Sequence, residues 1–168
     1  MIALTGNILL IFALLSSIVT LFFAKVPVID GHKKYKFASL FGTFQFLFIL
    51  FSYILLTYGF EISDFSLVTV WQNSEIQKPL IYKITGVWGN HEGSMLLWLL
   101  ILSICLFFII KYDKKIPKSV QLNTIAIQTS IIFAFLLFIL FTSNPFALQL
   151  PIPIDGVGLN TLLQDPGL

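Results

Sequence analysis

Arginine is absent from this sequence of 168 residues, so every basic side chain is a lysine. Without guanidinium groups, the chain lacks the planar fork that binds a carboxylate or a phosphate through two parallel hydrogen bonds. The formal net charge of +2 is small, and the lysines are divided between separate loops instead of sharing one face. These features argue against a nucleic-acid-binding protein.

Cysteine is almost absent as well, because Cys105 is the single one and lies in an apolar run. One cysteine excludes a disulfide within the chain and a cysteine cage for a metal ion. We expect Cys105 to be a small, buried apolar side chain.

Charged residues are scarce, at 11% of the chain, whereas soluble domains contain about 25%. Hydrophobic residues make up 57% of the chain and include 18 phenylalanines, and the mean hydropathy is +0.93. A single core of this size could not hide so much apolar surface from water. We therefore expect lipid to surround much of the molecule.

Four apolar stretches are long enough, or nearly so, to cross a bilayer, which takes about 20 residues of helix. They run from about 4 to 24, 37 to 58, 95 to 110 and 122 to 141, and none contains Asp, Glu, Lys or His. The first stretch lacks the basic start of a signal peptide, so we interpret it as a retained span. The sequence predicts an all-α membrane protein with about four transmembrane helices. The missing charges argue against an ion- or proton-translocating subunit.

The lysines predict the orientation of these spans, because basic loops favour the cytoplasmic side. Eight of the ten lie in the two loops at 25–36 and 111–121, whereas six of the eight acidic residues lie in the segments on the other side. We expect the N-terminus, an exported loop at 59–93 and an exported tail at 142–168 to face outward. Within that loop, the Val-, Phe- and Thr-rich segment 65–71 is typical of a short strand or an interfacial segment. The prolines and glycines of the tail predict an ordered, turn-rich segment.

The most unusual residues precede the third span, in the stretch from Trp88 to Ser94. Gly89 and Gly93 permit a tight backbone or a close approach of another helix. Asn90 or Ser94 is suited to cap the helix that follows, and an acidic residue at its start is favoured by the helix dipole. Two interpretations stay open: a capped, glycine-tightened helix start, or a polar surface on which a ligand or partner docks. One His beside one Glu is not a metal site. The candidate docking residues are Trp88, Gly89, His91, Glu92, Gly93, Ser94 and Trp98.

The run GVWGNHEGSMLLW at 86–98 resembles the WGxHEGSxLLW signature of the CcmF family, the haem lyase subunit of cytochrome c maturation. The tail segments TSNPF at 142–146, GLN at 158–160 and LLQDPGL at 162–168 are similar to the same family, with Thr161 in place of an expected proline. The chain therefore resembles the N-terminal portion of a larger polytopic bundle. Because it stops on Leu168 without a polar terminator, we expect an interrupted protein.

The resemblance implies a protein that accepts haem b from a CcmE-like chaperone and, with a CcmH-type partner, attaches it to apocytochrome c. It also implies the bacterial inner membrane with a periplasmic N-terminus, or the mitochondrial inner membrane in an organelle. The haem-ligand histidines and the WWD segment of the family are expected beyond Leu168. His32 and His91 are therefore not assigned as ligands, no residue is assigned to catalysis or to a metal, and this chain alone is not expected to be catalytic. The alternative is a membrane scaffold or assembly subunit of a respiratory complex, without haem binding or catalysis.

Overall fold

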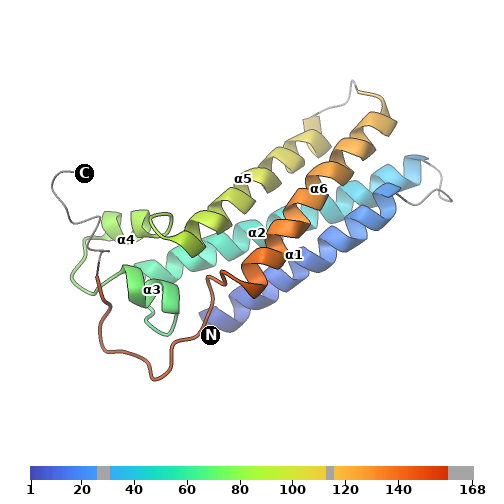
Figure 1. The fold of residues 1–168 in the computed structure, drawn as a ribbon. Helices are drawn as coiled ribbons and strands as arrows, with labels where there is room; N and C mark the ends of the chain where they lie inside the picture. The colour runs from blue at the N-terminus through green and yellow to red at the C-terminus, as the bar shows by residue number, and fades with distance from the viewer. Residues whose placement is uncertain (26–30, 113–115, 159–168) are drawn as a thin grey trace.

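Four long helices lie side by side in the computed structural model, and two short helices and an irregular tail gather at one end of them (Figure 1). The structure describes residues 1–25, 31–112 and 116–158, without the side chains of Gly31, His32 and Tyr112. The expected features at 159–168, including Thr161, and the side chain of His32 lie outside the described residues. The long helices are α1 (Ile2–Lys25), α2 (Gly31–Glu61), α5 (His91–Tyr112) and α6 (Lys118–Phe141), and the short ones are α3 (Val68–Asn73) and α4 (Leu80–Gly86).

The long helices contain 22 to 31 residues. At 1.5 Å per residue they extend for about 33 to 46 Å, which is enough to cross a hydrocarbon layer of about 30 Å. All four qualify by length and composition as membrane spans. The expectation of an all-α membrane protein with about four transmembrane helices is confirmed.

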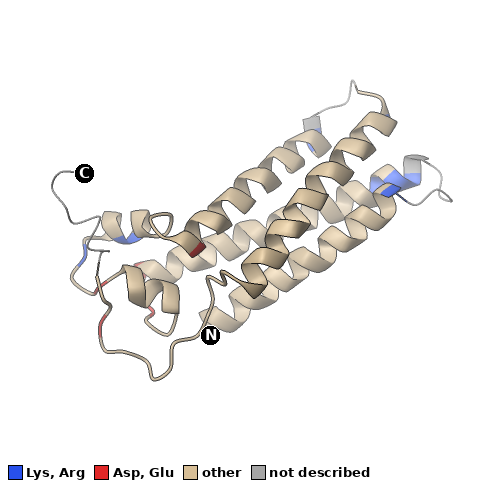
Figure 2. Ribbon diagram, viewed as in Figure 1, with Lys and Arg blue, Asp and Glu red and all other residues tan. Residues whose placement is uncertain are grey.

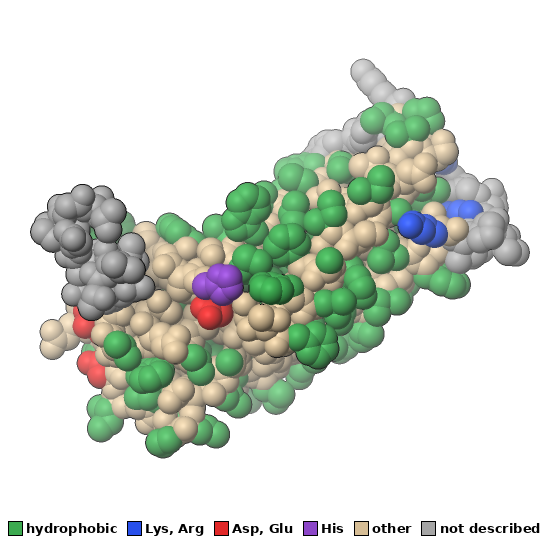
Figure 3. Space-filling view, viewed as in Figure 1, with side chains coloured by type: hydrophobic (Ala, Val, Ile, Leu, Met, Phe, Trp, Pro, Cys, Tyr) green, Lys and Arg blue, Asp and Glu red, His purple; other side chains and the backbone are tan. Residues whose placement is uncertain are grey.

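The bundle is apolar on its inside and on its outside. Leu10, Ile49, Leu106 and Leu136 are fully buried, one from each long helix. Phenylalanines from every long helix point outward, and hydrophobic side chains cover much of the visible side of the bundle in Figure 3. A helix that is apolar all round is typical of a membrane span. Cys105 also lies on the outer surface of the bundle, so the expectation that it is buried is wrong.

The described acidic residues gather toward one end of the bundle and most of the described lysines lie at the other, as Figure 2 shows, whereas Lys78 and Lys83 lie at the acidic end. We call the end with Lys25, Lys33, Lys34, Lys36, Lys111 and Lys118 the lysine-rich end, and the end with segments 62–90 and 142–158 the loop-bearing end. Within the described chain, all acidic side chains lie at the loop-bearing end or on the turns of α2 and α5 next to it. This separation supports the predicted orientation, which stays a prediction.

One short element differs from the expectation. Segment 65–71 is not a strand: α3 begins at Val68, and only Leu67 makes a single antiparallel bridge, with Leu148 of the tail. Leu67 and Val70 are fully buried. Packing of these apolar side chains at the end of the bundle outweighs the β-propensity of the segment.

The tail is packed onto the beginning of α1. Phe146 is fully buried, and its ring occupies the space that a Cβ atom of Gly6 would need. Asn7 Nδ2 donates to the carbonyl of Phe146 at 3.2 Å, and Asn144 Nδ2 donates to Asn7 Oδ1 at 2.8 Å. The end of α6 and the start of α1 are therefore joined by both packing and hydrogen bonds.

Two glutamines of the bundle, Gln45 and Gln128, test how much a hydrogen-bond partner of a side-chain amide contributes to stability. Gln45 is fully buried and neither of its amide atoms has a partner among the described residues, whereas Gln128 Nε2 donates to the Leu102 carbonyl at 3.2 Å. Gln45→Leu should stabilise the bundle by about 1–3 kcal/mol, because an unpaired buried amide carries a desolvation penalty. Gln128→Leu should destabilise it by about 0.5–1.5 kcal/mol. The measurement is unfolding of the purified chain in mixed micelles; equal destabilisation by both changes would mean that Gln45 has a partner.

Candidate functional site

The loop-bearing end is held together by backbone hydrogen bonds between the tail and the loop after α2. Val68 N donates to the Ala147 carbonyl at 3.0 Å, and Gln149 N donates to the Ser66 carbonyl at 2.8 Å. Further along, Val157 N donates to the Trp71 carbonyl at 2.8 Å. The two segments, about 80 residues apart in sequence, therefore form one structural unit.

Side chains reinforce this unit. Asp64 Oδ1 accepts hydrogen bonds from the backbone N and the hydroxyl of Ser66, at 3.1 and 2.6 Å. Lys83 Nζ of α4 donates to Ser63 Oγ at 2.6 Å. Lys78 is buried, and its Nζ donates to the carbonyl of Asn73, the last residue of α3, at 3.0 Å. Burial lowers the pKa of Lys78 from its ordinary value, and the nearby Glu75 carboxylate opposes this shift by favouring the charged form.

Asn90 organises the start of α5. Its Oδ1 accepts a hydrogen bond from Gly93 N at 2.7 Å, which satisfies a backbone donor in the first helical turn. Its Nδ2 donates to the carbonyls of Gly86 and Val87 at 2.7 and 3.0 Å. A Cβ on Gly93 would lie 1.7 Å from the Val87 carbonyl oxygen, so the backbone here approaches too closely for any other residue. The stretch is a capped, glycine-tightened helix start, one of the two interpretations that the sequence left open.

His91 links this helix start to the end of α6. Its Nε2 lies 3.0 Å from Ser143 Oγ, within hydrogen-bonding distance. Ser143 is buried, whereas His91 is exposed. The sequence did not identify Ser143 as a site residue; the resemblance of the TSNPF segment to the CcmF family was the only signal that marked it. A histidine and an acidic side chain lie together on the visible face near this end (Figure 3).

The candidate docking residues divide into two groups. Gly93 is buried, and Ser94 Oγ donates back to the His91 carbonyl at 2.9 Å, so both residues serve the helix start. Trp88, Gly89, His91 and Trp98 are exposed, and Glu92 is half-buried. Trp98 follows His91 by seven residues, or about two helical turns, and therefore lies on the same side of α5.

An apolar hollow lies beside this exposed group. Met95 of α5 and Ala134, Phe135 and Phe138 of α6 line a space of about 310 Å³. The exposed side chains thus include an imidazole and two indole rings, and the half-buried Glu92 carboxylate and the apolar hollow lie beside them. Tryptophan is one of the residue types that anchor protein partners.

The described residues do not form a haem or metal site. In the part of the chain that the structure describes, no three His, Cys, Asp or Glu side chains lie together in a way that could hold a metal ion. His91 is the one histidine whose side chain is described, and its Nε2 is engaged with Ser143 Oγ. No axial pair of ligands is present on these residues.

The geometry defines a membrane-embedded helical bundle with an ordered platform at one end. The platform is the unit that the tail and the loop after α2 form through their hydrogen bonds. Residues 88–168 match the cytochrome C assembly protein family. Over 123 residues, or 73% of the chain, the sequence is 52% identical to the cytochrome c-type biogenesis protein CycK of Rhizobium meliloti, of which it covers 18%. Over the whole chain it is 43% identical to the cytochrome c-type biogenesis protein ccl1 of Rhodobacter capsulatus, of which it covers 26%.

A solved structure agrees with these sequence relationships. The fold matches that of a cytochrome c heme lyase, CcmF, with a TM-score of 0.80 and 26% identity, over 87% of this chain and 25% of that one. The chain belongs to the CcmF/CycK/Ccl1 family of cytochrome c biogenesis proteins and resembles an N-terminal portion of them. It spans about a quarter or less of the length of these relatives.

The two glycines of the motif provide a test of the close backbone packing at the start of α5. Gly93→Ala should destabilise the chain by about 1–3 kcal/mol, because its Cβ collides with the Val87 carbonyl and forces the helix start apart. Gly89→Ala is the control: its Cβ would meet no atom closer than 3.5 Å, so the change should stay within about 0.5 kcal/mol. Unfolding in detergent compares the two; a Gly93→Ala chain as stable as Gly89→Ala would contradict the packing described.

Proposed function

We propose that this chain serves a membrane haem lyase in cytochrome c maturation, as a framework that presents a docking surface at its loop-bearing end. The observation that carries the proposal is the match, in sequence and in fold, to CcmF. The exposed Trp88, His91 and Trp98 and the half-buried Glu92 supply the surface. Its partners are a CcmE-like haem chaperone, a CcmH-type protein and apocytochrome c.

The proposed role is positioning and not catalysis. At the loop-bearing end, the polar side chains of Asp64, Lys83 and Asn90 are engaged in holding the structure together. We place the haem b site on the remainder of the family protein, because the resemblance to the CcmF family implies ligand histidines beyond Leu168. In haem enzymes the cofactor carries the chemistry and the protein supplies binding and orientation.

We propose the bacterial inner membrane as the location, with the loop-bearing end in the periplasm. The support is the concentration of lysines at the opposite end, which favours the cytoplasmic side. This orientation places His91, Trp88 and Trp98 toward the side where haem would be received. The same arrangement applies to the mitochondrial inner membrane if the protein is organellar.

Variants of His91 and Ser143 distinguish a docking role of His91 from a purely structural one. If His91 only ties α5 to α6, His91→Ala and Ser143→Ala should have the same effect, because each removes the same hydrogen bond. If His91 contacts a partner, His91→Ala should lower holocytochrome c formation by about tenfold, as for an interface residue worth more than 1.4 kcal/mol. Ser143→Ala should leave it near the normal value.

The measurement is haem staining of cytochrome c in cells that depend on this protein, with the membrane level of each variant determined by immunoblot. The docking surface would be rejected if cytochrome c formed at the normal level in all four variants. These are His91→Ala, Ser143→Ala, Trp88→Ala and Glu92→Gln. Normal haem staining in cells that lack the chain would support a scaffold subunit of another complex instead.

A second measurement tests where haem binds. The chain purified from membranes should contain no stoichiometric haem b, and haem should appear when it is purified together with the remaining portion of the family protein. The pyridine haemochrome spectrum measures the content. One haem per chain on residues 1–168 alone would overturn the assignment of the ligands to the remaining portion.

A further inference from the structure

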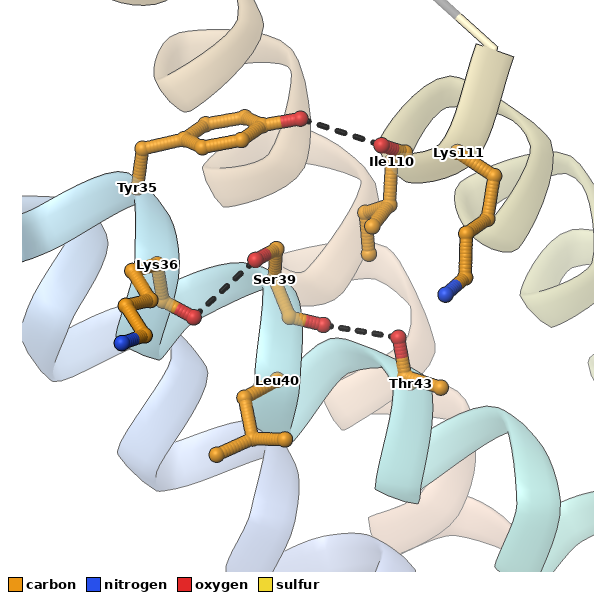
Figure 4. Close-up of a pocket in the computed structure, with 7 residues that line it drawn as sticks. All are labelled: Tyr35, Lys36, Ser39, Leu40, Thr43, Ile110 and Lys111. Atoms are coloured by element: carbon orange, nitrogen blue, oxygen red, sulfur yellow. Dashed lines mark hydrogen bonds between the residues drawn. The ribbon is translucent and has the colours of Figure 1, made fainter. Parts of the chain in front are cut away.

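A pocket opens at the lysine-rich end, between the beginning of α2 and the end of α5. It has a volume of about 340 Å³, and its polar lining comes from Tyr35, Lys36, Ser39, Thr43 and Lys111 (Figure 4). Tyr35 Oη donates to the Ile110 carbonyl at 3.0 Å and so ties α2 to α5 on one side of the pocket. The pocket lies at the opposite end of the bundle from the candidate docking surface.

The charge around this pocket is positive. Lys36 and Lys111 are both exposed and line the pocket from two different helices. In Figure 4, Lys111 extends on the side of Thr43, whereas the Lys36 ammonium group points away from Lys111, so that a change of its side-chain rotamer has to bring it to a shared anion. Within the described residues, every acidic side chain is remote, toward the loop-bearing end; Asp30 and Asp113 lie outside the described residues. No ion pair among the described residues neutralises Lys36 or Lys111, and Lys111 Nζ lies 5.7 Å above the centre of the Phe107 ring. Two ammonium groups that belong to the lining of one pocket favour an anion there over a cation.

Two hydroxyl groups lie between the lysines on the α2 wall of the pocket. Ser39 Oγ donates to the Lys36 carbonyl at 3.0 Å, and Thr43 Oγ1 donates to the Ser39 carbonyl at 2.8 Å. Each of these carbonyls belongs to the helix, so the side-chain bonds are supplementary and the hydroxyls can rotate to another acceptor. A phosphate oxygen in the pocket is such an acceptor.

The remaining wall is apolar and continues into the lipid-facing surface. Leu40 and Ile110 complete the lining, and Leu40 is exposed together with Phe37 and Phe44 on the same helix. A ligand that fits both parts has a phosphate at the level of the lysines and hydrocarbon beside the phenylalanines. A free phosphate would leave the apolar part uncovered.

We propose that this pocket binds the headgroup of an anionic phospholipid, with Lys36 and Lys111 as its cationic partners and Ser39 and Thr43 as hydrogen-bond donors. Basic pockets between transmembrane helices at the cytoplasmic side recognise such headgroups. The acyl chains lie along Leu40 and the phenylalanines of α2. The bound lipid bridges α2 and α5 at the end where the hydrogen bond from Tyr35 to the Ile110 carbonyl also joins them.

Native mass spectrometry of the purified 168-residue chain in non-ionic micelles tests this, with phosphatidylglycerol and phosphatidylcholine offered in equal amounts. Phosphatidylglycerol should be retained preferentially. Lys36→Gln and Lys111→Gln should each weaken its retention about fivefold, and the double variant about 25-fold, because a lysine near an anionic headgroup contributes roughly 1 kcal/mol. Lys33→Gln is the matched control: it removes the same charge from an exposed position of the same helix, outside the pocket.

Three results would overturn the proposal. Equal retention of the two lipids would show that the phosphate charge is not recognised. An effect of Lys33→Gln as large as that of Lys36→Gln would show general attraction to a basic surface and no site. Displacement of the lipid by millimolar inorganic phosphate would show a free-phosphate site. Circular dichroism establishes that each variant is folded, and the comparison of the two lipids on the unaltered chain stands without any variant.

Discussion

The bilayer confines the chemistry of this protein to the two ends of its bundle. The long helices present phenylalanine and leucine to the outside as well as to the inside, so charged groups within the membrane would lack both water and partners. The described lysines and carboxylates therefore lie in the loops or in the helical turns next to them. The separation of a lysine-rich end from an acidic, loop-bearing end follows from this constraint, and both proposed surfaces depend on it.

At the loop-bearing end, order comes from contacts between segments that are far apart in the sequence. Phe146 fills the space beside Gly6, and Gln149 continues the contact by donating to Ser66. An irregular segment at a membrane surface needs such bonds, since unpaired backbone groups are costly near lipid. Through Ser143, the tail also lies within hydrogen-bonding distance of His91 at the start of α5.

The four long helices were predictable from the sequence, whereas α3, α4 and the contacts between helices were not. Apolar runs of about 20 residues identify membrane spans because the thickness of the bilayer sets their length. Asn90 was one of two predicted caps, since capping is local chemistry. The pairing of His91 with Ser143 joins residues 52 positions apart, which no local pattern reveals. Cys105 was misjudged because an apolar side chain in a membrane protein is as stable against lipid as in the core.

The motif at the start of α5 shows why one sequence signature does not define one role. Asn90 and Gly93 face inward and would be needed for any helix that starts this way, with or without a ligand. His91 and Glu92 follow in the same turn and are not required by that geometry, because a cap needs neither an imidazole nor a carboxylate at these positions. The helix dipole favours Glu92 only modestly, by about 0.3–1 kcal/mol. His91 also pairs with Ser143, but neither this pairing nor the cap requires Glu92. His91 and Glu92 are therefore the part of the motif that we propose a partner contacts.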